Sequence, residues 1–259
     1  MKKQYISFYT VLLGLAMHAQ ESKTVNQGDL SVMPGTQVST YFDFENQSNG
    51  NVLNDGEMHF FGNYHNDGLF SFSTNKTTGY VVFEGLNASI QTISGNAPSY
   101  FYDALYQKAG GFHLTNETTY AGTVNLYDGV VLMDKQAGGA FIFLKGANHI
   151  NASDRSHVDG EVVKEGNESF TYPIGNGGFY RMAGISAPAI QADEYTGEYV
   201  LQNTDPLYPH SSRTGVIDRI DDKELWIINQ KTASDKNVLV TLSWDDRTTP
   251  NYLLDQNID

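Results

Sequence analysis

The sequence contains no cysteine among its 259 residues. This absence excludes disulfide bonds, thiolate catalysis, cysteine-ligated metal sites and a lipid anchor attached through cysteine. Small extracellular domains of eukaryotes usually depend on disulfides, whereas exported bacterial proteins often lack them. If the chain is exported, its composition therefore favours a bacterial source.

Basic residues are scarce. The chain has 16 Lys and Arg against 30 Asp and Glu, which gives a formal net charge of −14. Nucleic acids and anionic membrane surfaces are bound through Lys and Arg, so this balance argues against both as partners. Acidic loops could instead hold divalent cations.

Segments that combine Ala, Leu, Glu and Lys are also few, so long helices are not expected. Aromatic residues make up 12 % of the chain, charged residues only 18 %, and there are 25 glycines. Runs of β-branched and aromatic residues between Gly, Asn and Asp turns predict an all-β protein. The length suffices for one large domain or two smaller ones.

Residues 1–19 have the features of a signal peptide. Lys2 and Lys3 form a basic start, and the apolar run from Ile6 to Met17 is too short to cross a bilayer as a helix. Cleavage after Ala19 would leave Gln20 as the amino terminus. The alternative is a buried amino-terminal strand. No later apolar run approaches the roughly 18 residues of a membrane helix, so the sequence predicts an exported protein.

A turn motif occurs twice. Asn54-Asp55-Gly56 returns twelve residues later as Asn66-Asp67-Gly68, and such sequences favour tight turns. Each copy is followed by two apolar residues in alternation, Met58 with Phe60 and Phe70 with Phe72. Repeated strand–turn units bury their apolar faces by stacking, so we expect a β-solenoid, in the form of a parallel β-helix, over residues 20–155. A meander of hairpins is the alternative.

Further short strands are predicted up to the middle of the chain: Tyr80–Phe83, Ser89–Ile93, Gly111–Leu114, Thr123–Leu126, Val130–Met133 and Phe141–Leu144. The last two are apolar on both faces, as expected of strands covered on both sides. Phe101–Gln107 could form one helical turn, but its alternation favours a strand.

Residues 156–178 are expected to form a junction. They contain two strand candidates, Glu161–Lys164 and Ser169–Ile174, and a glycine-rich turn, Gly175–Gly178. Longer strands follow at wider spacing: Arg181–Ser186, Gly197–Gln202, Glu224–Asn229 and Val238–Trp244. They predict a partial β-sandwich over residues 179–259.

Several motifs carry a resemblance to a known group of proteins. Val158–Gly166 (VDGEVVKEG), Phe170–Gly175 (FTYPIG) and Tyr180-Arg181 follow one another in this order, after Gly122–Val131 (GTVNLYDGVV). They are similar to segments of Bacteroidetes cell-surface proteins that are exported by the type IX secretion system and described as gliding-motility-associated or adhesin-like. The resemblance implies a non-enzymatic structural or adhesive module. Its implied partners are the secretion machinery and surface glycans or other surface proteins.

Proteins of that group continue beyond the strand that corresponds to Val238–Trp244 and end in a carboxy-terminal secretion domain. This sequence stops at Asp259. We therefore expect either a part of a longer surface protein or a short relative that stays in the periplasm.

No residue pattern indicates a catalytic centre. Asp221-Asp222 and Asp245-Asp246 could supply the two carboxylates of a glycosidase, but solvated loops are the better interpretation in so acidic a chain. We expect no catalytic, cofactor-binding or metal-binding residues. A polysaccharide-degrading β-helix enzyme is the least favoured alternative.

Two weaker hypotheses concern metal ions. His59 and His65 could share a metal if the chain ran straight between them, although Gly62-Asn63 predicts a turn there. Asn54–Glu57 and Asn66–Gly68 could hold calcium between stacked turns, without the full EF-hand pattern. Ordinary turn chemistry is the default for both segments.

Tyrosines give the main hint of binding. Six of them are expected at loops and strand ends: Tyr64, Tyr100, Tyr102, Tyr106, Tyr120 and Tyr127. Aromatic faces stack on sugars, so a carbohydrate-binding or accessory module is the second functional hypothesis. Alternatively, these tyrosines cap a β core with the hydroxyl outward. Arg181 is expected to form a structural ion pair with an acidic neighbour.

Overall fold

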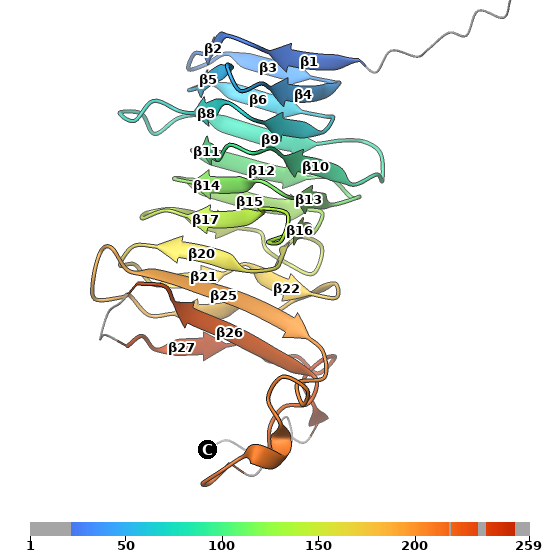
Figure 1. The fold of residues 1–259 in the computed structure, drawn as a ribbon, viewed down its shortest axis with the longest axis vertical. Helices are drawn as coiled ribbons and strands as arrows, with labels where there is room; N and C mark the ends of the chain where they lie inside the picture. Colours follow the sequence, from blue (N-terminus) through green and yellow to red (C-terminus); the bar gives the residue numbers. More distant parts are fainter. Residues whose placement is uncertain (1–21, 218, 233–236, 252–259) are drawn as a thin grey trace, which may run out of the picture.

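The computed structural model describes residues 22–217, 219–232 and 237–251, so the signal peptide expected at residues 1–19 lies outside them. The chain forms a parallel β-solenoid of about seven turns, and antiparallel strands follow at its carboxy-terminal end (Figure 1). The all-β class and the solenoid are thus confirmed, and the alternative of a hairpin meander is wrong.

Each of the first six turns of the solenoid contributes one strand to each of three parallel sheets, and the next turn contributes a strand to two of them. Sheet A contains β1 (Lys23–Asn26), β4 (Asp43–Asn46), β7 (Tyr64–Asn66), β10 (Gln91–Ser94), β13 (Phe112–Leu114), β16 (Val131–Met133), β19 (Val158–Asp159) and β22 (Ile174–Asn176). Sheet B contains β2 (Asp29–Val32), β5 (Asn51–Asn54), β8 (Leu69–Ser71), β11 (Ser99–Phe101), β14 (Glu117–Tyr120), β17 (Ala140–Phe143) and β20 (Val162–Glu165). Sheet C contains β3 (Gln37–Thr40), β6 (Glu57–Phe60), β9 (Tyr80–Glu84), β12 (Asp103–Gln107), β15 (Thr123–Asp128) and β18 (Asn148–Ile150).

The interior of the solenoid is filled with aromatic rings. Its largest fully buried side chains are all tyrosines and phenylalanines. The rings lie against one another from turn to turn, as between Phe60 and Phe83 (centroids 5.5 Å apart) and between Phe83 and Tyr106 (5.3 Å). Aromatic side chains bury large areas and gain further from such contacts. This packing explains how short strands of two to six residues form a stable rod.

An asparagine ladder lines the corner between sheets A and B. Asn26, Asn46 and Asn66 occupy the same register position in successive turns. Asn26 donates from Nδ2 to Oδ1 of Asn46 at 2.8 Å, and Asn46 donates in the same way to Asn66 at 2.8 Å. Asn46 and Asn66 are fully buried, and stacked amides of this kind satisfy each other while the corner turns.

The twelve-residue period expected from the Asn-Asp-Gly motif is wrong. Register partners in consecutive turns are twenty residues apart at Phe44 and Tyr64, and 29 apart at His65 and Ser94. The two motif copies lie at different corners, one between β5 and β6 and the other between β7 and β8. Each corner needs a tight turn, so the motif marks corners rather than whole turns.

Two strands expected to be covered on both faces are covered on one face only. In β16, Val131 is buried while Leu132 is 42 % exposed, and in β17 the side chains of Phe141 and Phe143 are buried while Ile142 is partly exposed. A solenoid sheet has one face toward the core and one toward solvent, so alternation returns even in apolar strands. The strand favoured over a helical turn at Phe101–Gln107 is confirmed by β11 and β12.

The junction expected at residues 156–178 contains the last stacked strands. β19, β20 and β22 all pair in parallel with the preceding turn. The expected glycine-rich turn then reverses the chain, because Gly177 and Gly178 connect β22 to the antiparallel β23 (Phe179–Tyr180). Their φ values of +64° and +82° fit the two-residue hairpin turn that requires positive φ at both positions.

Antiparallel strands follow this reversal. β25 (Glu194–Leu201) pairs with β20 and extends sheet B, and β26 (Glu224–Gln230) pairs with β25. A separate small sheet contains β21 (Phe170–Tyr172), β24 (Ala183–Ile185) and β27 (Val240–Leu242). The segment between β25 and β26 carries a 3-10 turn, η1 (His210–Ser212). Within the described ranges, no helix is long and apolar enough to span a membrane.

Candidate functional site

The outer face of sheet A carries two columns of mostly polar side chains that run along the solenoid. The first column places one residue in each turn: Lys23, Asp43, Asn63, Thr92, His113, Leu132 and Asp159. The second contains Val25, Glu45, His65 and Ser94. Phe44, Tyr64 and Ile93 alternate with these residues and are buried, so strand alternation turns the polar residues outward.

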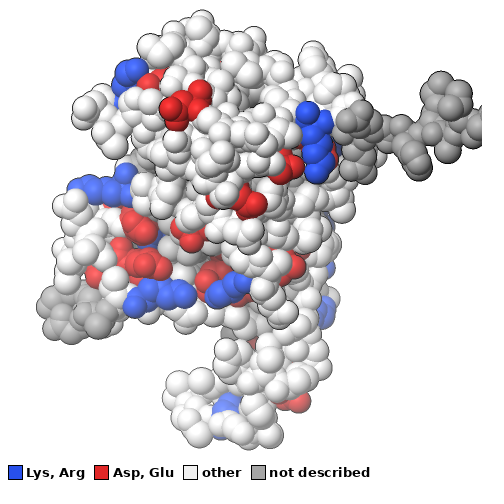
Figure 2. Space-filling model, turned by 45° about the horizontal axis from the view of Figure 1, so that its top comes forward, with Lys and Arg blue, Asp and Glu red and all other residues white. Residues whose placement is uncertain are grey.

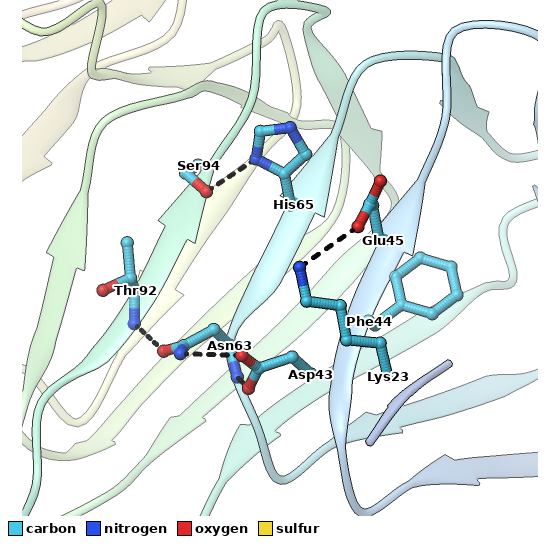
Figure 3. Close-up of a pocket in the computed structure, with 8 residues that line it drawn as sticks. All are labelled: Lys23, Asp43, Phe44, Glu45, Asn63, His65, Thr92 and Ser94. Carbon is cyan, nitrogen blue, oxygen red and sulfur yellow. Dashed lines mark hydrogen bonds and ion pairs between the residues drawn. The ribbon is translucent and has the colours of Figure 1, made fainter. Parts of the chain in front are cut away.

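The upper part of this face is a shallow groove of about 390 Å³ (Figure 3). Asn63 donates its backbone N–H to Oδ1 of Asp43 at 2.7 Å, and Asn63 Oδ1 accepts from the backbone N–H of Thr92 at 2.8 Å. His65 Nδ1 is hydrogen-bonded to Ser94 Oγ at 3.0 Å. These bonds join three successive turns and hold the polar side chains in place.

The lower part is a second groove of about 440 Å³, lined by residues that include His113, Asp134 and Asp159. Thr92 of the upper groove and His113 of the lower groove are register partners in β10 and β13. In the upper groove, His65 Nε2 lies 3.0 Å from Oδ2 of Asp67 in the adjoining turn loop, and in the lower groove His113 Nε2 lies 3.7 Å from Asp134 Oδ2. The two grooves therefore form one polar track along the rod.

Exposed aromatic side chains lie at the corner between sheets C and A, just before the strands that line the upper groove. Tyr41 is 73 % exposed and Phe42 is 56 % exposed. The ring of Tyr41 is stacked on that of Phe61 in the next turn, with centroids 4.7 Å apart and planes at 13°. Phe42 directly precedes Asp43, and Phe61 lies two residues before Asn63. An apolar platform thus adjoins the hydrogen-bonding residues.

The track carries charges of both signs. The side-chain amide of Gln47 and the ammonium group of Lys23 lower the pKa of the Glu45 carboxyl. The backbone N–H of Asn96 and the ring of His65 likewise lower the pKa of Asp67. On the face that Figure 2 shows, acidic and basic side chains lie beside one another and much of the surface is uncharged. Such a surface offers hydrogen-bond donors and acceptors without a strong electrostatic potential of one sign.

Three of the six tyrosines expected to be exposed are core residues. Tyr64, Tyr106 and Tyr120 are fully buried. Tyr64 is hydrogen-bonded to Ser99 Oγ at 2.9 Å, and the hydroxyls of Tyr106 and Tyr120 are hydrogen-bonded to each other inside the solenoid. Burial raises the pKa of all three phenols. The alternative, hydroxyls pointing outward, is wrong for them as well.

The other three tyrosines lie at or near the surface. Tyr100 is 39 % exposed on sheet B and Tyr127 is 55 % exposed on sheet C. Tyr102 is half-buried and packs edge-on against Phe72, with centroids 5.5 Å apart. The three are thus separated over different faces and form no common platform.

The two histidines considered for a shared metal lie in different sheets. His59 is in β6 of sheet C, where Nδ1 is 2.5 Å from Glu84 Oε1 and Nε2 is 2.9 Å from Glu57 Oε1. His65 is in β7 of sheet A. The predicted turn at Gly62-Asn63 separates them, so the hypothesis of a metal shared by these two residues is wrong. Among the described residues, no group of three or more His, Asp and Glu side chains could hold a metal ion.

The aspartates considered for calcium are engaged by hydrogen-bond donors. Asp55 is buried and accepts from the backbone N–H and Oγ of Ser73, at 2.8 and 2.7 Å, and from Lys76 Nζ at 2.8 Å. Asp67 accepts from the backbone N–H and Nδ2 of Asn96, both at 2.9 Å. In both Asn-Asp-Gly segments, the aspartate carboxylate therefore connects one turn of the solenoid to the next by hydrogen bonds.

The expected ion pair of Arg181 is confirmed. This buried guanidinium lies 3.2 Å from Asp245 Oδ2 and 3.8 Å from Glu224 Oε2. Arg247 in turn connects Asp245 to Asp154, at 2.7 Å from each. Of the carboxylates weighed as a glycosidase pair, Asp245 therefore belongs to this network, and Asp221 accepts from the backbone N–H groups of Lys223 and Glu224.

Sequence reasoning did not identify two surfaces. One is the sheet A track, whose signal is the alternation of polar and buried residues in β4, β7 and β10. The other is an apolar groove of about 490 Å³ at the carboxy-terminal end, lined by residues that include Tyr208, Trp226, Ile228 and Trp244. The chain has only two tryptophans, and both line this groove.

Comparison with family models, curated proteins and solved structures found no match to the chain.

Proposed function

We propose that the chain is an exported, non-enzymatic structural and adhesive module of a bacterial cell-surface protein. The observation that carries this proposal is the filled interior of the solenoid. Aromatic rings and the asparagine ladder occupy the core of the described turns, and polar side chains capable of recognition lie on the outer faces. A rod of this kind is suited to hold a binding face away from its anchor.

The type IX resemblance supports the same proposal. The segment Val158–Gly166 forms β19 and β20, and Phe170–Gly175 leads through β21 into β22. In this view the shared pattern encodes the end of the solenoid and the reversal at Gly177 and Gly178. We further propose that residues 179–259 begin a β-sandwich, because β25–β26 and β24–β27 provide two antiparallel layers.

A specific observation favours carbohydrate binding as the second function. Tyr41 and Phe42 are exposed and directly precede Asp43, which lines the hydrogen-bonding groove of sheet A. Sugars are recognised by aromatic faces together with polar groups. The partners proposed are surface glycans or other surface proteins, with the secretion machinery during export.

Two measurements test the structural and adhesive function. Intact cells of the source organism are treated with protease, and the released peptides and the native mass of the chain are determined; we expect surface peptides. A protected chain that ends near Asp259 would instead indicate a periplasmic role. In parallel, beads coated with residues 20–259 should adhere to cells or matrix better than beads coated with the unfolded chain. Release of products from uronate polysaccharides, with or without calcium, would contradict the non-enzymatic assignment.

A further inference from the structure

We infer that the outer face of sheet A binds a neutral, linear glycan that lies along the axis of the solenoid. The inference rests on the proposed adhesive function and names the ligand class and the site. The upper and lower grooves meet where Thr92 pairs with His113. A polymer can therefore follow them without leaving the sheet.

The length of the track favours a polymer over a single sugar. Its lining begins at Lys23 in β1 and ends at Asp159 in β19, the first and seventh strands in the order of sheet A. Six strand spacings amount to about 29 Å. This length exceeds that of a single sugar, so several units of an extended glycan would lie along the track.

The chemistry of the upper groove favours a sugar over a peptide or an aliphatic ligand. Tyr41 rests with one ring face on Phe61 and leaves the other uncovered, since the residue is 73 % exposed. A pyranose has an apolar face that stacks on such a ring, while its hydroxyls exchange hydrogen bonds with carboxylates, amides and hydroxyls. Asp43, Asn63 and Ser94 supply these groups in a fixed arrangement.

The charges along the track favour a neutral glycan. Four carboxylates line it, those of Asp43, Glu45, Asp134 and Asp159, against two ammonium groups, those of Lys23 and Lys135. The whole chain has a net charge of −14. Uronate or sulfated polymers would place anions beside these carboxylates, with a repulsion that neutral sugars avoid.

The test begins with an array of linear neutral, amino-substituted and uronic-acid oligosaccharides, probed with residues 20–259. We expect neutral hexasaccharides to bind, and to bind at least about tenfold more tightly than the disaccharide of the same linkage, because several subsites act together. Calorimetry on the best hexasaccharide then compares variants. Tyr41→Ala with Phe42→Ala, and separately Asn63→Ala, should each weaken binding about tenfold.

Tyr127→Ala is the matched control, because this tyrosine is 55 % exposed on the outer face of sheet C. It should alter affinity less than about twofold. The inference is overturned if no neutral glycan binds, if uronates bind best, or if the sheet A variants bind normally. If the array is negative while coated beads still adhere to cells, the glycan site is wrong and the adhesive function stands. If a glycan binds but its affinity is reduced by Trp244→Ala and not by the sheet A variants, the carboxy-terminal groove is the site and the inference is wrong.

Discussion

Asn46 donates from Nδ2 to Oδ1 of Asn66 at 2.8 Å, although the two residues are twenty positions apart in the sequence. The same amide group of Asn46 also donates to the backbone carbonyl of Leu69 at 3.0 Å, and its oxygen accepts from Asn26. One fully buried side chain therefore connects three turns. Its hydrogen bonds compensate for taking the amide out of water.

Replacing Asn46 by alanine should destabilise the solenoid by about 2–4 kcal/mol, because it leaves Asn66 Oδ1 and Asn26 Nδ2 without this partner in a buried corner. Urea denaturation of residues 20–259 measures the loss. Asn49→Ala is the control, since its exposed side chain donates to Gln27 O at 2.9 Å, and it should cost less than about 0.5 kcal/mol. Equal losses in both variants would contradict the role of the ladder.

Because the hydroxyls of Tyr106 and Tyr120 are hydrogen-bonded to each other in the core, we expect the changes in unfolding free energy caused by removing each of them to be strongly non-additive. Tyr120→Phe leaves the Tyr106 hydroxyl without its partner in the aromatic core and should cost about 1–3 kcal/mol. Adding Tyr106→Phe removes the orphaned group and should recover most of that loss, because replacing both partners by apolar groups of the same shape is nearly neutral. Denaturation of the two single variants and the double variant completes the cycle. Additive losses would show that the hydroxyls act independently.

Removal of the Asp55 carboxylate should destabilise the protein equally with and without calcium. Asp55→Ala takes away the acceptor for Ser73 and Lys76, which we expect to cost about 1–3 kcal/mol. The melting temperature is measured in excess calcium and in chelator. A loss seen only in calcium would show that this turn holds an ion.

The ion pairs of Asp245 should make the stability of the carboxy-terminal end sensitive to acid. Hydrogen bonds from Arg247, together with the charge of Arg181, hold the pKa of the Asp245 carboxyl well below its usual range. Because the folded pKa lies below the unfolded value of about 3.9, the stabilisation is complete above that pH and disappears as the pH falls toward the folded pKa.

The matched measurement compares Asp245→Asn with the wild type in urea at pH 7 and at about pH 2.5. We expect the variant to be less stable by about 1 kcal/mol at pH 7, and the difference to shrink at the acidic pH. Asp246→Asn, at an exposed neighbouring position, should follow the wild type at both pH values. A difference that grows on acidification would contradict the assignment.

The sequence allowed the all-β class, the stacking principle and most strands to be predicted, because strand alternation and Gly-Asn turns are local signals. The period could not be obtained from Asn-Asp-Gly alone, since this tripeptide serves two of the three corners. The better signal was the recurrence of Asn26, Asn46 and Asn66 at intervals of twenty residues, whose meaning depends on a buried contact between turns.

Whether each tyrosine side chain points into the core or toward solvent could not be predicted from the sequence either. Tyr106 shares the inward face of β12 with Ala104, whereas Tyr127 follows the inward Leu126 in β15 and faces outward. A tyrosine is compatible with either face, because its ring is apolar and its hydroxyl is polar. The buried hydroxyl of Tyr120 supplies the hydrogen-bond partner that Tyr106 needs on the inward face, and this contact between turns cannot be read from either strand alone.

The unequal lengths of the solenoid turns have a consequence for how the number of turns can change in evolution. The turn that pairs His65 with Ser94 is nine residues longer than the one that pairs Asn46 with Asn66, yet the strands stay in register because the surplus lies outside them, at residues 72–79 and 85–90. A coding segment duplicated or deleted between equivalent corners would add or remove one whole layer, about 5 Å of rod, and restore the same contacts. The reach of such a protein can thus be inherited as a variable number of units.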